Sequence, residues 1–362
     1  MHWLPAILII PYILVLLKIY RSLLKIKPFN VTGDPVTFVS VIVACRNKEE
    51  HMLQLLKSIS GQDYPKNLFE IIIVDDNSTD RTAEATASFN ATGNILLIYN
   101  KGSGKKQALK TGISKASGNL IITTDADCLM GKSWIKTVAA FYEKHKPDMI
   151  ICPVQIESST GFFGRFQELE FLSLQGITAG SAQAGTGTMC NGANLAFTKE
   201  AYLNNAGNLN FEIASGDDIF FLYSLKKQNS SKILWLESAH AIVKTASSPT
   251  AGSYLKQRRR WISKSVAYTD RFSILLGIVT FVTILLQVSL LFAGLIYQPF
   301  LLVFLTIFII KSVPDFLILL NTTRRYGKPE LMNWFLPIQA VYPFYVLLVV
   351  FYSLISPDSK KN

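Results

Sequence analysis

The sequence has few cysteines, and they form no pattern typical of a metal site. The four cysteines among 362 residues are Cys45, Cys128, Cys152 and Cys190, and none shows the short ligand spacing of a zinc site. Their low density also argues against a disulfide framework. We therefore expect reduced thiols in a cytosolic domain.

Acidic residues are scarce relative to basic ones. The 36 Lys and Arg residues outnumber the 25 Asp and Glu residues, giving a formal net charge of +11. This excess accompanies 49% hydrophobic residues and a mean hydropathy of +0.29. An anionic membrane surface therefore explains the basic charge better than nucleic acid does.

The amino-terminal apolar run lacks the features of a signal peptide. Residues 3–17 are apolar, but the basic residues follow them, and no small-residue cleavage pattern comes after the run. We therefore expect residues 1–27 to hold a membrane anchor whose basic flank stays in the cytoplasm.

The carboxyl-terminal third contains three longer apolar runs, at residues 274–297, 300–320 and 334–355. Each approaches the ~20 residues that span a bilayer, so residues 272–356 are predicted to form about three transmembrane helices. Lys311 and Asp315 lie inside one of these runs, where a charged pair indicates either function or simple helix stabilisation.

Basic residues beside these runs indicate the orientation. Arg271 and the cluster at residues 324–328 fall on the cytoplasmic side if the amino terminus lies outside. Lys360 and Lys361 then fall outside, so the topology of the last span stays open. The sequence thus predicts an integral membrane protein with a cytoplasmic catalytic domain, most simply in a bacterial inner membrane.

Residues 36–265 have a different character from the apolar ends. The short β-branched runs "TFVSVIVAC", "FEIIIVDD", "NILLIYN" and "NLIITTDAD" alternate with helix-like stretches at residues 49–60, 79–89 and 105–115. This alternation predicts an α/β fold with a mostly parallel sheet covered by helices. Ligands of such sheets bind beyond the carboxyl ends of the strands.

Two aspartates one residue apart, Asp125 and Asp127, end the fourth of these strands. Such a pair can share Mg²⁺ or Mn²⁺ with a diphosphate, because these ions take one or two carboxylates plus phosphate oxygens. A three-residue pattern is weak evidence for such a site by itself, but its place at the end of a strand strengthens that evidence.

Other polar residues follow the earlier strands. Arg46, Asn47 and Glu49 come after the first strand, and Asp75 and Asp76 end the second. An acid there can accept hydrogen bonds from a base or ribose, although Asp75 is equally suited to capping the next helix, where Ser78 is a further candidate cap.

The glycine loop "KGSGKKQALKTG" does not fit the P-loop pattern. With Lys105 at a helix start it still suits a phosphate, although a merely solvated lysine is the alternative.

Two later segments add amides and a second acid pair. Asn191 and Asn194 precede a predicted helix, and Asp217 and Asp218 open another. One of these two acids is expected to be an N-cap, and the other is placed to act as a general base.

The basic segment "YLKQRRRWISK" precedes the first late span. One interpretation is a membrane-surface helix with snorkelling Arg258 and Arg259. The other is a ring at Trp261 that stacks on a sugar or acceptor beside an arginine that binds a diphosphate.

Taken in order, these segments resemble the membrane-bound family 2 glycosyltransferases, which have the GT-A fold. The matching positions are Ala44 to Glu49, Asp76, Lys105, Asp125 to Asp127, Asn194, Asp217 with Asp218, and the Q-x-x-R-W pattern from Gln257 to Trp261. The resemblance covers residues 36–265 and the flanking spans in outline. It departs where the family often has proline and this chain has Ala44 or Cys45.

The resemblance implies a role for each matching residue. Donor or nucleotide binding falls to Ala44, Arg46, Asn47, Glu49, Asp76, Lys105, Asp125, Gln257, Arg260 and Trp261. Asp127 and Asp125 would hold Mg²⁺ or Mn²⁺, and Asn194 with Trp261 would contact the acceptor. Asp218, beside Asp217, would deprotonate the acceptor for an inverting displacement of UDP.

The acceptor has two candidates. One anchor and three late spans resemble lipid glycosyltransferases, and residues 158–176 suit either an amphipathic surface helix or a core helix. We therefore expect transfer of one sugar to a membrane lipid. The alternative is a processive polysaccharide synthase, for which oligomers would supply further spans, and a remote third is an inactive nucleotide-binding scaffold.

Overall fold

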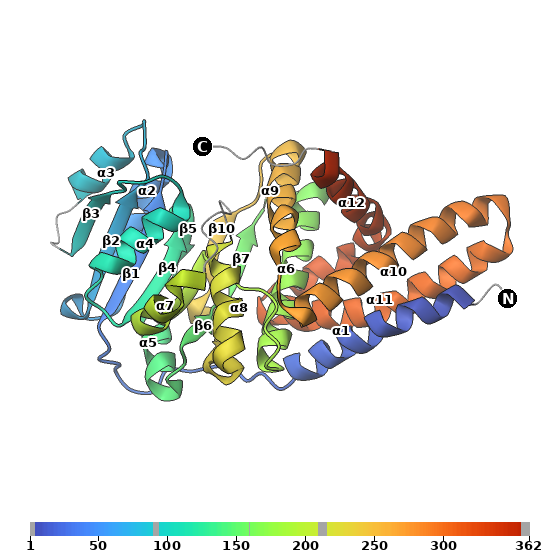
Figure 1. Ribbon diagram of the computed structural model, residues 1–362, viewed down its shortest axis with the longest axis horizontal. Coiled ribbons are helices and arrows are strands. Elements are labelled where there is room, and N and C mark those ends of the chain that lie inside the picture. Colours follow the sequence, from blue (N-terminus) through green and yellow to red (C-terminus); the bar gives the residue numbers. More distant parts are fainter. Residues whose placement is uncertain (1–3, 90–93, 159, 209–215, 356–362) are drawn as a thin grey trace. The chain divides into compact units, whose positions relative to one another are not determined.

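The structure, a computed structural model, describes residues 4–89, 94–158, 160–208 and 216–355 (Figure 1). The chain forms two compact units. The first, here called the sheet unit, comprises Ile26–Glu157 and Gly185–Ala246. The second, the helical unit, comprises Met1–Lys25, Ser158–Ala184 and Ser247–Asn362. The segments at 158–184 and 247–265, which we expected to belong to the catalytic domain, thus group with the apolar helices.

The sheet unit is built on a seven-stranded sheet with the order β3-β2-β1-β4-β8-β6-β9. Only β8 runs antiparallel to its neighbours in the described sheet, so the sheet is mostly parallel, as the sequence predicts. Its strands are β1 (Val39–Cys45), β2 (Phe69–Asp75), β3 (Ile95–Tyr99), β4 (Leu120–Asp125), β6 (Met149–Ile151), β8 (Asn194–Thr198) and β9 (Ile233–Trp235). A second sheet has the order β5-β10-β7, with β5 (Cys128–Met130), β10 (Val243–Ala246) and β7 (Val154–Glu157).

The helices of the sheet unit follow the predicted pattern closely. α2 (Glu49–Ser60) and α4 (Lys105–Lys115) have the expected bounds, and the others are α3 (Thr82–Phe89), α5 (Trp134–His145), α7 (Lys199–Asn205) and α8 (Asp217–Asn229). α3 begins later than expected, because the Asp80 carboxylate accepts a hydrogen bond from the Thr82 N–H at 3.0 Å. The expectation that Ser78 caps this helix is therefore wrong. α4 packs tightly on β1, since a Cβ at Gly112 would lie 2.7 Å from Ile42 Cγ2.

The helical unit contains three long helices side by side, α1 (Ile10–Leu23), α10 (Arg271–Ile296) and α11 (Pro299–Arg325), together with α6 (Phe162–Gln183) and α9 (Ala251–Ser263) (Figure 1). α6 packs against α1 and α11 and buries most of its side chains. A Cβ at Gly176 would lie 2.4 Å from Thr322 Oγ1, and one at Gly180 would lie 2.6 Å from the Ile19 carbonyl oxygen. These small residues let the helices approach closely, which agrees with the core-helix interpretation of α6.

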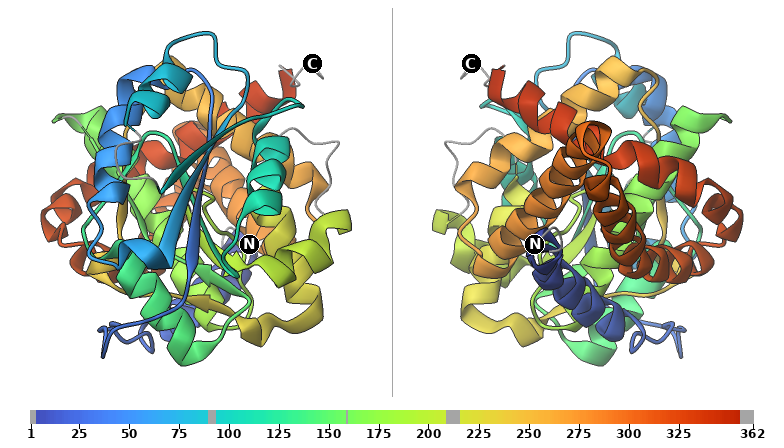
Figure 2. Two further views of the ribbon diagram at one scale, coloured as in Figure 1. Left: turned by 90° about the vertical axis from the view of Figure 1, so that its left-hand side faces the viewer. Right: turned by 90° about the vertical axis from the view of Figure 1, so that its right-hand side faces the viewer.

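The last helix, α12 (Phe335–Ile355), follows the short 3₁₀ helix η7 (Pro329–Trp334). It is one of four helices in the described chain that are long and apolar enough to cross a membrane. Nevertheless, it runs across α10 and α11 instead of alongside them (Figures 1 and 2). It packs against α9, with the rings of Tyr254 and Tyr345 stacked at 5.7 Å and the Arg259 guanidinium 5.2 Å from the Tyr352 ring.

This orientation predicts that α12 does not cross the bilayer, so that the chain ends on the side where α10 begins. The sequence expectation that Lys360 and Lys361 lie outside concerns residues beyond the described ones. Cysteine labelling with an impermeant maleimide tests the side, in a Cys190→Ser background. We expect Ser359→Cys to react from the same side as Val266→Cys, which is 91% exposed just before α10. Reaction together with Gln298→Cys, in the α10–α11 turn, would show that α12 spans.

Candidate active site

The acidic residues of the sheet unit gather at one edge of the large sheet. β1 is parallel to β2 and β4, with Cys45 opposite Asp75 and Ala44 opposite Asp125. The carboxyl ends of these three strands are therefore level, and the acids that end β2 and β4 share one edge. This is the edge at which open α/β sheets bind ligands.

Asp125 and Asp127 each form an ion pair with a lysine. Lys105 pairs with Asp125, and Lys48 Nζ lies 2.6 Å from Asp127 Oδ2. Burial by itself would raise the pKa of Asp127, but the hydrogen bond and charge of Lys48 outweigh it and hold this pKa below its ordinary value. The two acid side chains remain 35% and 34% exposed, so they are reachable from solvent.

The donor set at this edge fits a divalent cation that arrives with a diphosphate. The described residues contain no group of three or more His, Cys, Asp or Glu that would hold a metal unaided. Mg²⁺ and Mn²⁺, however, need only one or two protein carboxylates when phosphates and waters complete the shell. Lys48 and Lys105 balance the charge of the same carboxylates in this structure.

The second acid pair opens α8 and lies close to Lys105. Asp218 Oδ2 accepts a hydrogen bond from the Gly192 N–H at 3.0 Å, and a Cβ at Gly192 would lie 3.8 Å from Lys105 Nζ. Burial and the charge of Asp218 raise the pKa of Asp217, while the charge of Lys105 lowers it. Burial would lower the pKa of Lys105, but Asp125, Asp217 and Asp218 together raise it above its ordinary value. Lys105 therefore connects the two acid pairs.

The expectation that Asp217 or Asp218 caps α8 is wrong. Gly216 occupies the N-cap position with a φ of +89°, a conformation that glycine adopts readily. Both acids come after the cap, and Asp218 Oδ1 accepts a hydrogen bond from the Ile219 N–H at 2.9 Å within the first turn.

The loop after β1 is tied to the loop after β2. Asn47, at a φ of +53°, accepts a hydrogen bond through Oδ1 from the Thr79 N–H at 2.8 Å. Glu49 Oε2 accepts one from the Arg81 N–H at 2.8 Å, and the Arg46 side chain is exposed. Asn47 and Glu49 thus position the loop, and a direct contact of Ala44, Arg46, Asn47 or Glu49 with the donor stays a prediction.

Asp75 and Asp76 are both buried, 3% and 5% exposed. Asp76 accepts hydrogen bonds from Asn100 Nδ2 at 2.6 Å and from the Gly104 N–H at 2.9 Å, so it fixes the glycine loop that precedes Lys105. Asp75 accepts one from the Ser78 N–H through Oδ2, while its Oδ1 has no partner among the described residues. A contact of Asp76 with the nucleotide stays a prediction, and Asp75 carries the unused acceptor.

The structure corrects the role expected for Asn194. This side chain is completely buried, and its amide already makes three hydrogen bonds. Nδ2 donates to the carbonyl oxygens of Pro153 and Ala241 at 2.7 and 2.8 Å, and Oδ1 accepts from Trp134 Nε1 at 3.0 Å. With this capacity in use and no exposed surface, Asn194 joins structural elements instead of contacting an acceptor sugar.

Gln257, Arg260 and Trp261 lie on α9, in the helical unit, and their contact with a donor or acceptor stays a prediction. The neighbouring Arg258 is not a snorkelling surface residue, because it is only 3% exposed. Its Nε donates to Glu170 Oε1 at 3.0 Å, and its guanidinium lies 4.1 Å from the Trp261 ring. Sequence reasoning missed this pair and missed Lys48, although Lys48 lies within the segment that matched the family.

The fold and this site define a GT-A-like glycosyltransferase architecture. Residues 40–205 match the model of Glycosyl transferase family 2. A mannosyltransferase of Pyrobaculum calidifontis, PcManGT, solved with GDP-Man and Mn²⁺, has a similar fold, with a TM-score of 0.61 at 18% identity over 99% of this chain and 100% of that one.

Two curated relatives differ in what their names describe. The poly-beta-1,6-N-acetyl-D-glucosamine synthase of Staphylococcus epidermidis is 26% identical over 67% of this chain and 60% of that protein. The beta-monoglucosyldiacylglycerol synthase of a Nostoc strain is 25% identical over 62% of this chain and 48% of that protein. The regions that match this chain make up between 20% and 60% of the length of its curated relatives, including relatives other than these two.

The role of Asn194 predicts a loss of stability on substitution. Asn194→Ala removes the hydrogen bonds shown to the Ala241 carbonyl oxygen and from the Trp134 N–H, at about 1–3 kcal/mol for each buried group left unpaired, while the Pro153 carbonyl oxygen keeps the Val243 N–H. We expect a melting temperature several degrees lower, measured by thermal unfolding of purified protein, with no change for Asn119→Ala, whose side chain is exposed. A normal melting temperature with a raised KM for acceptor would contradict the structural role.

Proposed function

We propose that the protein transfers a sugar from a nucleotide sugar to a membrane lipid, with inversion at the anomeric carbon. The observation that carries this proposal is the arrangement of two acid pairs around Lys105 at the ligand-binding edge of the sheet. UDP is the nucleotide that the family resemblance implies.

The donor diphosphate would lie against Asp125 and Asp127, with Mg²⁺ or Mn²⁺ between the carboxylates and the phosphates. The metal, when bound, would neutralise the charge of the departing diphosphate. Binding of the donor would release Lys48 from Asp127 and bring Lys105 beside a phosphate oxygen. Both lysines would then stabilise negative charge as the bond between sugar and diphosphate breaks.

Asp218 is the proposed general base. It would take the proton from the acceptor hydroxyl while the acceptor oxygen forms a bond to the anomeric carbon. The bond from that carbon to the diphosphate oxygen breaks, and UDP leaves with the electron pair. The hydrogen bond that Asp218 accepts from the Gly192 N–H fixes the orientation of this carboxylate. Asp217 supports the pair but ionises less readily because of its burial.

A lipid acceptor is favoured by the helical unit, which belongs to the same chain as the sheet unit. The apolar helices of the helical unit border a pocket whose lining includes polar side chains. The similarity to a beta-monoglucosyldiacylglycerol synthase agrees with this acceptor. The similarity to a poly-N-acetylglucosamine synthase supports the alternative, a processive polysaccharide synthase, equally well.

Turnover by purified protein in lipid nanodiscs tests the proposal. With Mn²⁺ or Mg²⁺, a panel of UDP-sugars and extracted lipids, we expect UDP release and lipids heavier by one hexose or N-acetylhexosamine. Asp127→Asn and Asp218→Asn should lower the rate by about 10²–10⁴-fold. Asp34→Asn, at a side chain that is 89% exposed, should not. A ladder of repeated sugars would establish a polymer synthase. No turnover with any donor would favour the third alternative, an inactive nucleotide-binding scaffold.

The position of Lys105 predicts a shift in the pH dependence of the rate. Its charge lowers the pKa of Asp217, so Lys105→Met should raise that pKa further and move the acid limb of kcat/KM to higher pH. Lys101→Met, at an exposed lysine of the same loop, is the matched control and should leave the limb in place. An unchanged acid limb in Lys105→Met would show that the charge of Lys105 does not act on the acid pair.

A further inference from the structure

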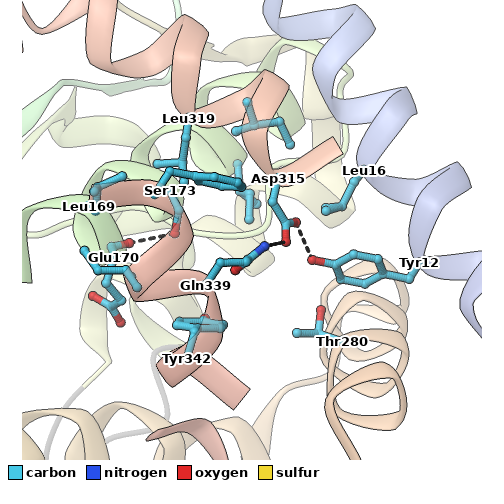
Figure 3. Close-up of a pocket in the computed structure, with 14 residues that line it drawn as sticks. Tyr12, Leu16, Leu169, Glu170, Ser173, Thr280, Asp315, Leu319, Gln339 and Tyr342 are labelled. Carbon is cyan, nitrogen blue, oxygen red and sulfur yellow. Dashed lines mark hydrogen bonds between the residues drawn. The ribbon is translucent and has the colours of Figure 1, made fainter. Parts of the chain in front are cut away.

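A pocket in the helical unit lies between α1, α6, α10, α11 and α12 (Figure 3). The cavity itself has a volume of about 90 Å³, and the empty space including its open mouth is about 680 Å³. Apolar side chains such as Leu16, Leu169 and Ile318 form part of the wall, and the rest is polar. Polar atoms are costly among apolar helices unless they are paired or face a ligand.

One wall of this pocket is a hydrogen-bonded network centred on Asp315 (Figure 3). Tyr12 donates its hydroxyl to Asp315 Oδ1 at 2.6 Å, and Gln339 Nε2 donates to Oδ2 at 2.5 Å. Lys311 Nζ, on a side chain 2% exposed, lies 2.8 Å from the same Oδ2. The network ties α1, α11 and α12 together, and Lys311 cancels the charge of Asp315.

The second acid of the pocket is also neutralised. Glu170, on α6, accepts a hydrogen bond from Arg258 Nε at 3.0 Å and pairs with Arg258 through its other oxygen as well. Both carboxylates that line the pocket thus have a cationic partner. A ligand with a net charge would meet no opposite free charge, so the lining favours an uncharged polar group.

Three polar groups facing the pocket keep unused hydrogen-bonding capacity. Within the described chain, the structure gives no hydrogen bond to Gln339 Oε1, to the Tyr342 hydroxyl or to the Thr280 hydroxyl. Thr280 differs in this from Thr283 on the same helix, which donates to the Val279 carbonyl oxygen at 2.7 Å. The pocket therefore offers one free acceptor and two free hydroxyls.

The pocket lies near the basic ends of the long helices. Asp315 is about 15 Å along α11 from Arg325, and Thr280 is about 14 Å along α10 from Arg271, at 1.5 Å per residue. These depths place the pocket in one half of the bilayer, on the side of the basic ends of α10 and α11. An amphiphile whose polar backbone lies just inside the apolar region suits this depth.

We propose that this pocket binds the uncharged backbone of the acceptor, a two-chain neutral lipid such as a diacylglycerol. The Tyr342 and Thr280 hydroxyls would donate to ester carbonyl oxygens, and Gln339 Oε1 would accept from a lipid hydroxyl. Tyr342, Thr280 and Gln339 are then specificity-determining residues for lipids without a phosphate. The assignment rests on the proposed lipid-transfer function and names the structural feature that selects the lipid.

The double variant Tyr342→Phe/Thr280→Val tests the assignment, because it removes two unpaired hydroxyls and keeps the shape of both side chains. Thr306→Val, on α11 outside the pocket lining, is the matched control. In nanodiscs with dioleoylglycerol as acceptor, we expect the KM for this lipid to rise about 5–30-fold. The KM for the UDP-sugar and the release of UDP to water should not change.

Binding is measured separately, with a photoactivatable diacylglycerol and no UDP-sugar. We expect cross-links to α11 and α12, with dioleoylglycerol competing and phosphatidic acid failing to compete. Absent cross-links, equal competition by phosphatidic acid, or an unchanged KM in the double variant would overturn the pocket assignment. Failure of the wild-type protein to glycosylate any lipid would instead overturn the proposed function, whatever the cross-links show.

Discussion

The charge of Lys105 is the constraint on which the candidate site depends. Asp125, Asp217 and Asp218 would otherwise repel one another, because like charges at short range destabilise the folded state. Lys105 pairs with Asp125 and lies beside Asp217 and Asp218, so it relieves repulsion within and between the two pairs. Lys105 is placed to do so because Asp76 accepts a hydrogen bond from the Gly104 N–H and thereby fixes the turn from which α4 begins.

The helical unit depends on a comparable pairing of buried charges. Glu168 and Glu170, neighbours on α6, are both buried, and they pair with Lys328 and Arg258 respectively. Removing one partner from such a pair costs about 3–5 kcal/mol, because the other charge stays buried. Together with the close approach at Gly176 and Gly180, these pairs attach α6 to its neighbours. The segment that contains Gln257 and Trp261 is therefore positioned from within the helical unit.

Local sequence patterns predicted most of the sheet unit. Runs of β-branched residues located β1, β2 and β4, and helical periodicity gave the bounds of α2 and α4, because these signals act over a few residues. The roles of Asn194 and Arg258 depend on distant partners, Trp134 and Glu170, which no local pattern reveals. The span predicted at α12 agrees with its length and apolar composition, but these properties do not give the direction of the helix relative to α10 and α11.

The central claim is that Asp125 and Asp127 hold a metal-bound nucleotide diphosphate beside Lys105. A cryo-electron microscopy structure with UDP and Mn²⁺ tests it most directly. The account predicts density for the metal between Asp127 and the diphosphate, with Lys48 released from Asp127 and Lys105 beside a phosphate oxygen. A diphosphate bound elsewhere, with the Lys48–Asp127 pair intact, would contradict it.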